Sequence, residues 1–116
     1  MSEIFVFGSN LAGIHGAGSA RYAWKRRGAE YGVGVGRTGA AYAIPTKDEG
    51  LRTLPLWKIA EHVKTFLEYA REHPDDAFLI VAIGCGLAGY TPEEIGPMFK
   101  GAPQNCILPM EFEGFV

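Results

Sequence analysis

The feature that most constrains the fold is a run of six consecutive apolar residues, FLIVAI, at positions 78–83. A strand with one face in water alternates apolar and polar residues, whereas an unbroken apolar run requires cover on both faces. Residues 4–7 (IFVF) form a shorter run of the same kind, closed by Gly8. Both runs predict strands of a mainly parallel sheet with helices on both of its faces.

Two segments between the strands have the spacing of amphipathic helices. Residues 17–27 predict a short helix that ends in basic residues and is capped by Gly28. Residues 55–73 predict the longest helix, because apolar side chains recur there every three or four positions. The apolar positions of this longest helix are Ile59, Ala60, Val63, Phe66, Leu67 and Ala70.

A third, shorter helix is predicted by its start signals. Thr91 is the expected N-cap, Pro92 fits the first helical position, and Glu94 completes a capping box with Thr91. Its position after the run 78–83 continues the alternation of strand and helix along the chain.

Two weaker strands complete the pattern. Residues 41–45 predict a strand that Pro45 ends, and residues 106–109 predict a last short one. The glycine-rich segments 8–18 and 32–39 are predicted to be irregular, because glycine gives a strand no side chain to pack. Strands thus alternate with helices, and residues 1–116 are predicted to form a single α/β domain.

Composition and charge exclude several classes of protein. The net charge of −2 gives no general attraction to nucleic acid or to membrane surfaces. Two cysteines, Cys85 and Cys106, make neither a disulfide scaffold nor a zinc site, so no metal is expected. The apolar run at the N-terminus is too short for a signal peptide, and none is long enough for a membrane span. We expect a cytoplasmic protein, and the sequence leaves its oligomeric state open.

Glycine is concentrated in two windows. Twelve of the 16 glycines lie in residues 8–39 and 84–89, and each window follows a predicted strand. In open α/β sheets, ligands bind beyond the carboxyl ends of the strands. Glycine allows backbone amides to approach phosphate oxygens closely, and the start of a helix adds partial positive charge. Two such loops facing each other are suited to a diphosphate, although glycines after strands are also ordinary turn residues.

Three side chains in these loops have both a functional and a structural interpretation. Asn10 either hydrogen-bonds a hydroxyl group of a ligand or caps a turn. His15 is either a general base or a ligand contact, or a solvent-exposed loop histidine without a role. Cys85 is either a nucleophile at a helix N-terminus or a small buried residue.

Three segments resemble motifs of macrodomains, in the same order. They are GAGSA at residues 16–20, YAIPTK at 42–47 and IGCGLAG at 83–89. The motifs are most similar to those of the terminal ADP-ribose protein glycohydrolases and the related antitoxin macrodomains. The chain also resembles small macro-like proteins of bacteria and their phages. The resemblance covers residues 4–99 and implies a three-layer macrodomain-like fold.

The resemblance implies that the protein binds ADP-ribose or a related nucleotide-ribose diphosphate, with no cofactor. The first loop would wrap the diphosphate and the distal ribose, the second would hold the diphosphate from the other side, and Tyr90 would lie near the ligand. The ligand-binding residues that we expect are Asn10, His15, Gly16, Ala17, Gly18, Gly84, Cys85, Gly86, Leu87, Ala88, Gly89 and Tyr90.

Two departures from the family pattern keep other functions open. In the glycohydrolases a lysine attacks the distal ribose with help from an aspartate. Lys47 matches that lysine, but Ala88 stands where the aspartate is expected. The earlier strand whose aspartate reads the adenine amino group has no counterpart here. The alternatives are an ADP-ribosyl hydrolase that uses Lys47, for which Asp48 is the nearest carboxylate, and a protein-interaction module without a small ligand.

Overall fold

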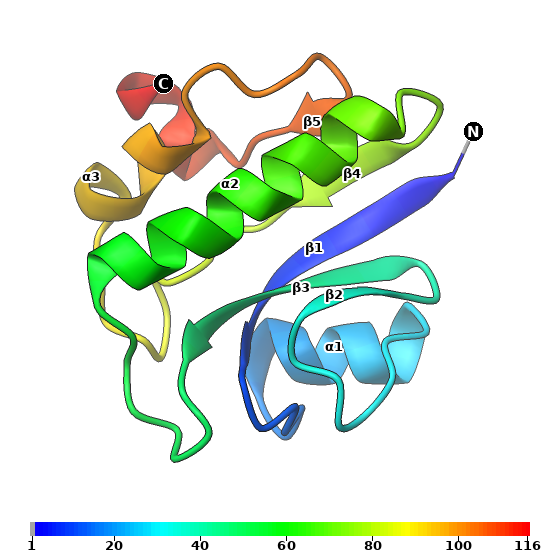
Figure 1. Ribbon diagram of the computed structural model, residues 1–116, viewed down its shortest axis with the longest axis vertical. Coiled ribbons are helices and arrows are strands. Elements are labelled where there is room, and N and C mark those ends of the chain that lie inside the picture. Colours follow the sequence, from blue (N-terminus) through cyan, green and yellow to red (C-terminus); the bar gives the residue numbers. More distant parts are fainter. Residues whose placement is uncertain (1) are drawn as a thin grey trace.

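The central strand of the molecule is also the first strand of the chain. The computed structural model describes residues 2–116 and shows a five-stranded sheet with helices packed against it (Figure 1). In chain order the elements are β1 (Glu3–Asn10), α1 (Gly18–Arg26), β2 (Gly36–Thr38), β3 (Ala41–Lys47), α2 (Leu56–Glu72), β4 (Ala77–Ile80), α3 (Pro92–Ile95), the 3-10 turn η1 (Gly96–Phe99), β5 (Cys106–Ile107) and the 3-10 turn η2 (Met110–Phe115).

The sheet is mixed but mostly parallel. Its strand order is β2-β3-β1-β4-β5, so β1 lies in the middle. β1 pairs in parallel with β3 on one side and with β4 on the other, and β4 pairs in parallel with β5. Only β2 runs antiparallel, as an edge strand beside β3. The predicted α/β class with a mainly parallel sheet is therefore confirmed.

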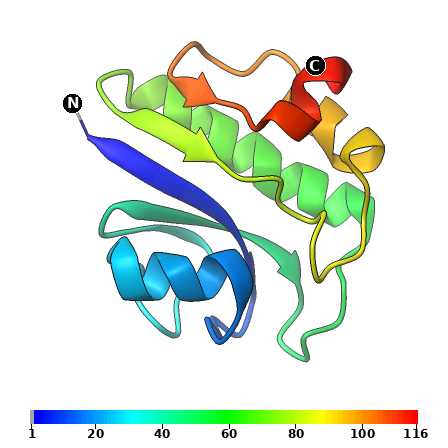
Figure 2. The ribbon, with the colours of Figure 1, turned by 180° about the vertical axis from the view of Figure 1, so that it is seen from behind.

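Helices lie on both faces of the sheet. α2 covers the face formed by alternate residues of β1, β3 and β4, including Ile4, Ile44 and Phe78. α1 covers the opposite face over Phe7 and Ala43 (Figure 2). The alternation of side chains along each strand thus divides the core into two clusters, one beneath each helix.

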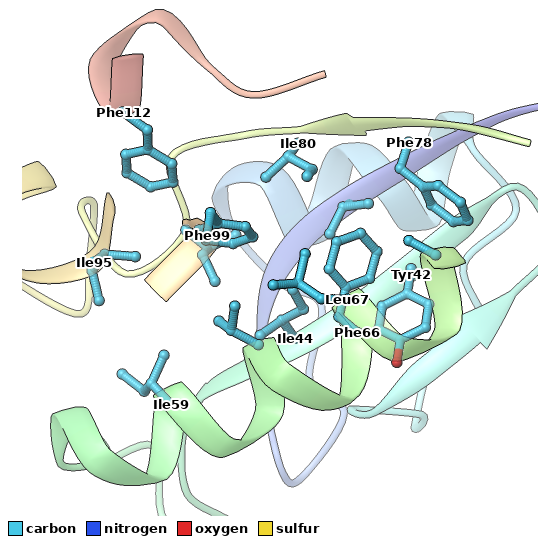
Figure 3. Packing of buried hydrophobic residues seen from close by; sticks show 14 of the residues in the cluster. Tyr42, Ile44, Ile59, Phe66, Leu67, Phe78, Ile80, Ile95, Phe99 and Phe112 are labelled. Atoms are coloured by element: carbon cyan, nitrogen blue, oxygen red, sulfur yellow. The ribbon is translucent and has the colours of Figure 1, made fainter. Parts of the chain in front are cut away.

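The larger cluster is centred on aromatic side chains that meet α2 (Figure 3). Phe66 is fully buried and packs edge-to-face against Tyr42 and Phe78, with ring centroids 4.9 and 5.4 Å away. Burial raises the pKa of Tyr42 to about 12, with a smaller contribution from Tyr69. Ile59, Val63, Leu67 and Ala70 are buried along the same helix face, as the periodicity predicts, whereas Ala60 is half-buried.

Two strands are longer than predicted. β1 does not end at Phe7 but continues to Asn10, because Gly8 and Ser9 pair with the neighbouring β3. β3 continues through Pro45 to Lys47. The proline is tolerated because β2 pairs only with 41–43, so Pro45 lies where the outer edge of β3 has no partner strand that needs its amide.

Two further predictions are wrong in part. Residues 36–38, predicted to be irregular, form the edge strand β2, which is stabilised by pairing with β3 rather than by its own side chains. The apolar run 78–83 forms a strand only up to Ile80. Phe78 and Ile80 are buried under α2, but Leu79 is only half-buried on the opposite face, because α1 packs against β1 and β3 and leaves β4 partly open.

The predicted helix ends are confirmed. Thr91 and Glu94 form the reciprocal capping box of α3, with Pro92 in its first turn. Gly28 follows α1 with a φ of +79°, which a residue with a side chain rarely adopts. Within residues 2–116, no helix combines the length and the apolar character that crossing a bilayer requires.

We predict that Phe66→Ala lowers the free energy of unfolding by about 3–5 kcal/mol, because it leaves a cavity among the aromatic rings under α2. The exposed Glu68 on the same helix provides the control, and Glu68→Ala should change stability by no more than about 0.5 kcal/mol. Chemical denaturation followed by circular dichroism measures both. Equal effects of the two changes would contradict the assignment of this cluster as the core.

Candidate functional site

The carboxyl ends of β1, β3 and β4 meet at one edge of the sheet (Figure 1). The amide of Leu11 donates to the carbonyl of Lys47 at 2.9 Å, and the amide of Val81 donates to the carbonyl of Val6 at 3.2 Å. A pocket of about 460 Å³ opens beside these ends. Its lining residues are Gly8, Ser9, Asn10, Ile14, Gly16, Ala17, Gly18, Ser19, Ala20, Thr46, Lys47, Leu51, Val81, Ala82, Ile83, Gly84, Gly86, Leu87 and Ala88.

Three parts of the chain form this pocket. The first wall comprises residues 8–20, which contain the end of β1 and the start of α1, and the second wall comprises residues 81–88 after β4. The end of β3 and the turn after it contribute Thr46, Lys47 and Leu51 between the two walls. The two glycine-rich loops predicted from the sequence therefore line one pocket.

The side chain of Asn10 shapes the first wall. Its Nδ2 donates to the carbonyl of Ile14 at 2.8 Å, and its Oδ1 accepts from the amide of Ile14 at 3.0 Å. The side chain is buried although the residue lines the pocket. Asn10 therefore stabilises the turn, as its structural interpretation predicts, and it also lines the pocket.

The first wall is backed by a second glycine-rich segment, 32–36. A Cβ atom at Gly34 would overlap the carbonyl oxygen of Asn10, and one at Gly13 would overlap the backbone of Gly32. The hydroxyl of Ser9 donates to the carbonyl of Gly34. Backbone thus packs directly on backbone here. This close packing explains why glycine is needed at positions 13 and 34, independently of phosphate binding.

His15 lies behind the first wall and does not line the pocket. Its ring is completely buried between Phe7 and Tyr31. Nε2 is 3.2 Å from the carbonyl of Glu30 and 3.1 Å from that of Val33, so it donates to these oxygens. Within residues 2–116, Nδ1 has no hydrogen-bond partner. His15 is therefore neither a lining residue of the pocket nor the solvent-exposed loop histidine of the alternative, because its buried ring fixes the first wall to residues 30–33.

The start of α1 gives the first wall a positive electrostatic potential. Residues 16–20 line the pocket, and α1 begins at Gly18. In the described part of the chain, no side chain caps this helix start and its first turn contains no acidic residue. The first amides of a helix lack intrahelical acceptors and carry the positive end of the helix dipole. This wall is therefore suited to an anion.

The second wall is attached to the turn after β3. The hydroxyl of Tyr90 donates to the carbonyl of Leu54 at 2.7 Å, and the hydroxyl of Thr53 donates to the carbonyl of Ala88 at 3.1 Å. Gly84, Gly86, Leu87 and Ala88 line the pocket, whereas Cys85, Gly89 and Tyr90 do not. The tyrosine expected near the ligand thus holds two loops together.

The Cys85 thiol is not activated by its position. Burial raises its pKa, and the carboxylates of Glu111 and Glu94 raise it further. A nucleophilic cysteine needs the opposite shift, toward the thiolate. The surroundings of Cys85 therefore do not support a nucleophile, although the residue is half-buried rather than buried.

Lys47 is the ionisable residue of the pocket. Within residues 2–116, no other Lys, Arg, His, Asp, Glu, Cys or Tyr lines it, and Lys47 forms no ion pair. Asp48 follows in sequence, but its Oδ1 accepts from the amides of Gly50 and Arg52 at 2.8 and 2.9 Å. That carboxylate is therefore used to build the turn after β3. No group of three or more metal-ligating side chains is present in the part described.

Sequence reasoning missed several residues of the pocket. The sequence indicates no role for Ser9, in the predicted irregular segment 8–18, or for Thr46, in the loop after the predicted strand 41–45, yet both line the pocket. Ile14, Leu51 and Leu87 line it with exposed side chains, and only Leu87 was expected there. Leu51 adopts a φ of +63°, and leucine itself gives no signal of that conformation.

Comparison of the chain with protein-family models, with curated proteins and with solved structures found no match. The geometry of the pocket is therefore the basis of the functional proposal.

We predict that Gly34→Ala destabilises the protein by about 3 kcal/mol, because the added methyl group must displace the backbone of the first wall. Gly86→Ala is the matched control, since a Cβ there meets open space and neither glycine has a left-handed φ. Its effect should stay within about 0.5 kcal/mol. Thermal and chemical denaturation measure the difference, and equal stability of the two variants would contradict the backbone contact.

The cysteines provide a test through their reactivity. Burial raises the pKa of Cys106 from 9.0 to about 11, against a smaller lowering by Arg71, and the pKa of Cys85 is raised as well. At pH 7.5 both should therefore react with iodoacetamide more slowly than an unstructured cysteine peptide, Cys106 by at least about tenfold. Denaturant should restore the peptide rate. Fast alkylation of Cys85 in the folded protein would mean that it is an activated thiolate.

Proposed function

We propose that this protein binds ADP-ribose, or a related nucleotide-ribose diphosphate, in the pocket between the first and second walls. The observation that carries the proposal is the convergence of two glycine-rich walls, an uncapped helix start and a single lysine on one open pocket. A chain whose loops were only scaffold would be expected to fill this space with side chains.

Charge supports an anionic ligand. The start of α1 and the ammonium group of Lys47 are both positive, and no carboxylate lines the pocket within residues 2–116. Helix starts bind phosphate through free amides and the helix dipole, and lysine binds it as a point charge. The pocket volume of 460 Å³ lies within the range of roughly 300–1,000 Å³ that holds small ligands and cofactors.

The side chains around the pocket favour ligand binding over hydrolysis. A lysine nucleophile must lose its proton, and a leaving group needs an acid. Ala88 offers neither, Asp48 is engaged in its turn, and His15 is buried behind the first wall. We therefore assign Lys47 to phosphate binding. The macrodomain resemblance supports the choice of ADP-ribose, and the two free thiols are compatible with the expected cytoplasmic location.

We predict that ADP-ribose binds to the native protein and that Lys47→Ala weakens binding by about tenfold or more, because a charged hydrogen bond to phosphate is lost. Lys64→Ala, on the exposed side of α2, is the matched control and should bind as the native protein does. Titration calorimetry measures all three affinities.

The panel should include other nucleotides derived from NAD. Absence of heat and of any thermal shift with every member would refute the proposed function. Turnover of an ADP-ribosylated substrate that depends on Lys47 would instead favour the hydrolase.

A further inference from the structure

Three exposed apolar side chains stand at the pocket. Ile14, Leu51 and Leu87 all line it, although they are 41, 46 and 77% exposed. They come from three different segments, namely the first wall, the turn after β3 and the second wall. We call these three residues the apolar rim. Exposed apolar side chains grouped around one pocket mark a binding surface.

Leu51 is held at this position against its backbone preference. It is the single non-glycine residue with a positive φ, +63°, in residues 2–116. Asp48 imposes the conformation, since its carboxylate accepts from the amides of Gly50 and Arg52 and its carbonyl accepts from that of Leu51 at 3.1 Å. A strained conformation that the surroundings enforce is typical of functional sites.

Leu51 and Leu87 lie on loops that are joined to each other. The bonds from Thr53 to Ala88 and from Tyr90 to Leu54 connect the turn after β3 with the second wall. The two leucines are therefore carried by one connected framework, and Ile14 is carried by the opposite wall. The apolar rim therefore has two leucines on one side of the pocket and one isoleucine on the other.

The polar side chains of the pocket are mostly engaged already. Those of Ser9, Asn10 and Thr46 hydrogen-bond to backbone groups of the protein. In the described chain this leaves Ser19, in the first turn of α1, and Lys47, at the end of β3, as polar side chains free for a ligand, and both suit phosphate. Among residues 2–116, no free amide or carboxylate side chain lines the pocket to recognise the edge of a base.

We propose that the apolar rim holds the nucleobase by contact with its faces and does not read its edge. The site then takes nucleoside diphosphates whichever base they carry, with the phosphates at Lys47 and the start of α1. This inference rests on the proposed function, since it says where the base of the same ligand binds. Every base has an apolar face, so contact with that face does not depend on which base the nucleotide carries.

Titration calorimetry with ADP, GDP, CDP, UDP and inorganic pyrophosphate tests the proposal. The four nucleotides should bind within about threefold of one another, and pyrophosphate should bind at least about tenfold more weakly than any of them. A nucleotide that binds more than about tenfold tighter than the other three would show that its edge is read, and would overturn the inference. Equal affinity for pyrophosphate and the nucleotides would also overturn it.

Two variants test the apolar rim itself. Leu51→Gly removes the side chain and also relieves the strained φ, so the folded protein should be at least as stable as the native one. Leu87→Ser removes the second contact. Each should weaken all four nucleotides by a similar factor and leave pyrophosphate unchanged. Ile107→Ser, on β5, is the control, since Ile107 is 52% exposed and lies outside the pocket, and it should change the affinity for neither the nucleotides nor pyrophosphate.

These outcomes separate the inference from the proposed function. If ADP-ribose binds but one base is preferred, or if the rim variants bind every nucleotide as the native protein does, the proposed function stands and the apolar rim does not hold the base. If ADP-ribose, the four nucleotides and pyrophosphate all fail to bind, the proposed function and the inference fall together.

Discussion

The pairing of β1 with a parallel strand along each of its edges determines where everything else at the site lies. Parallel strands point the same way, so the carboxyl ends of β3, β1 and β4 reach one edge of the sheet together. From there the chain leaves β1 toward α1 on one face and leaves β4 toward α3 on the other. Connections that diverge to opposite faces open a crevice between adjacent strands, and the pocket occupies it.

Those parts of the fold that depend on local patterns could be predicted from the sequence. The apolar runs indicated β1 and β4, the helical period indicated α2, and Thr91 with Glu94 indicated the start of α3. The strand through Pro45 could not be predicted, because its tolerance depends on where β2 stops pairing. β2 itself has almost no strand propensity and exists because β3 offers it an edge. Pairing between distant segments overrode local preference in both places.

The candidate site, too, could be predicted from the sequence only in part. The glycine-rich segments directly after β1 and β4 both line the pocket, which follows from the topology, whereas residues 32–34 of the first glycine window pack behind the first wall. Whether a particular side chain points into it could not be predicted. His15 turns inward to the carbonyls of residues 30 and 33, and Tyr90 turns away to Leu54. These orientations depend on partners that lie 15 to 36 residues away along the chain. The position of Leu51 at the pocket could not be predicted either, because Asp48 imposes its backbone conformation.

The close contact between the first wall and residues 32–34 has a consequence for recognition. Where Gly34 meets Asn10 and Gly13 meets Gly32, backbone touches backbone with no side chain between them that could rotate. The hydroxyl of Ser9 and the buried ring of His15 fix the same two segments together. The wall is therefore rigid, and a ligand that binds there as proposed would meet a surface that needs no ordering, so that little of the free energy of association would be lost.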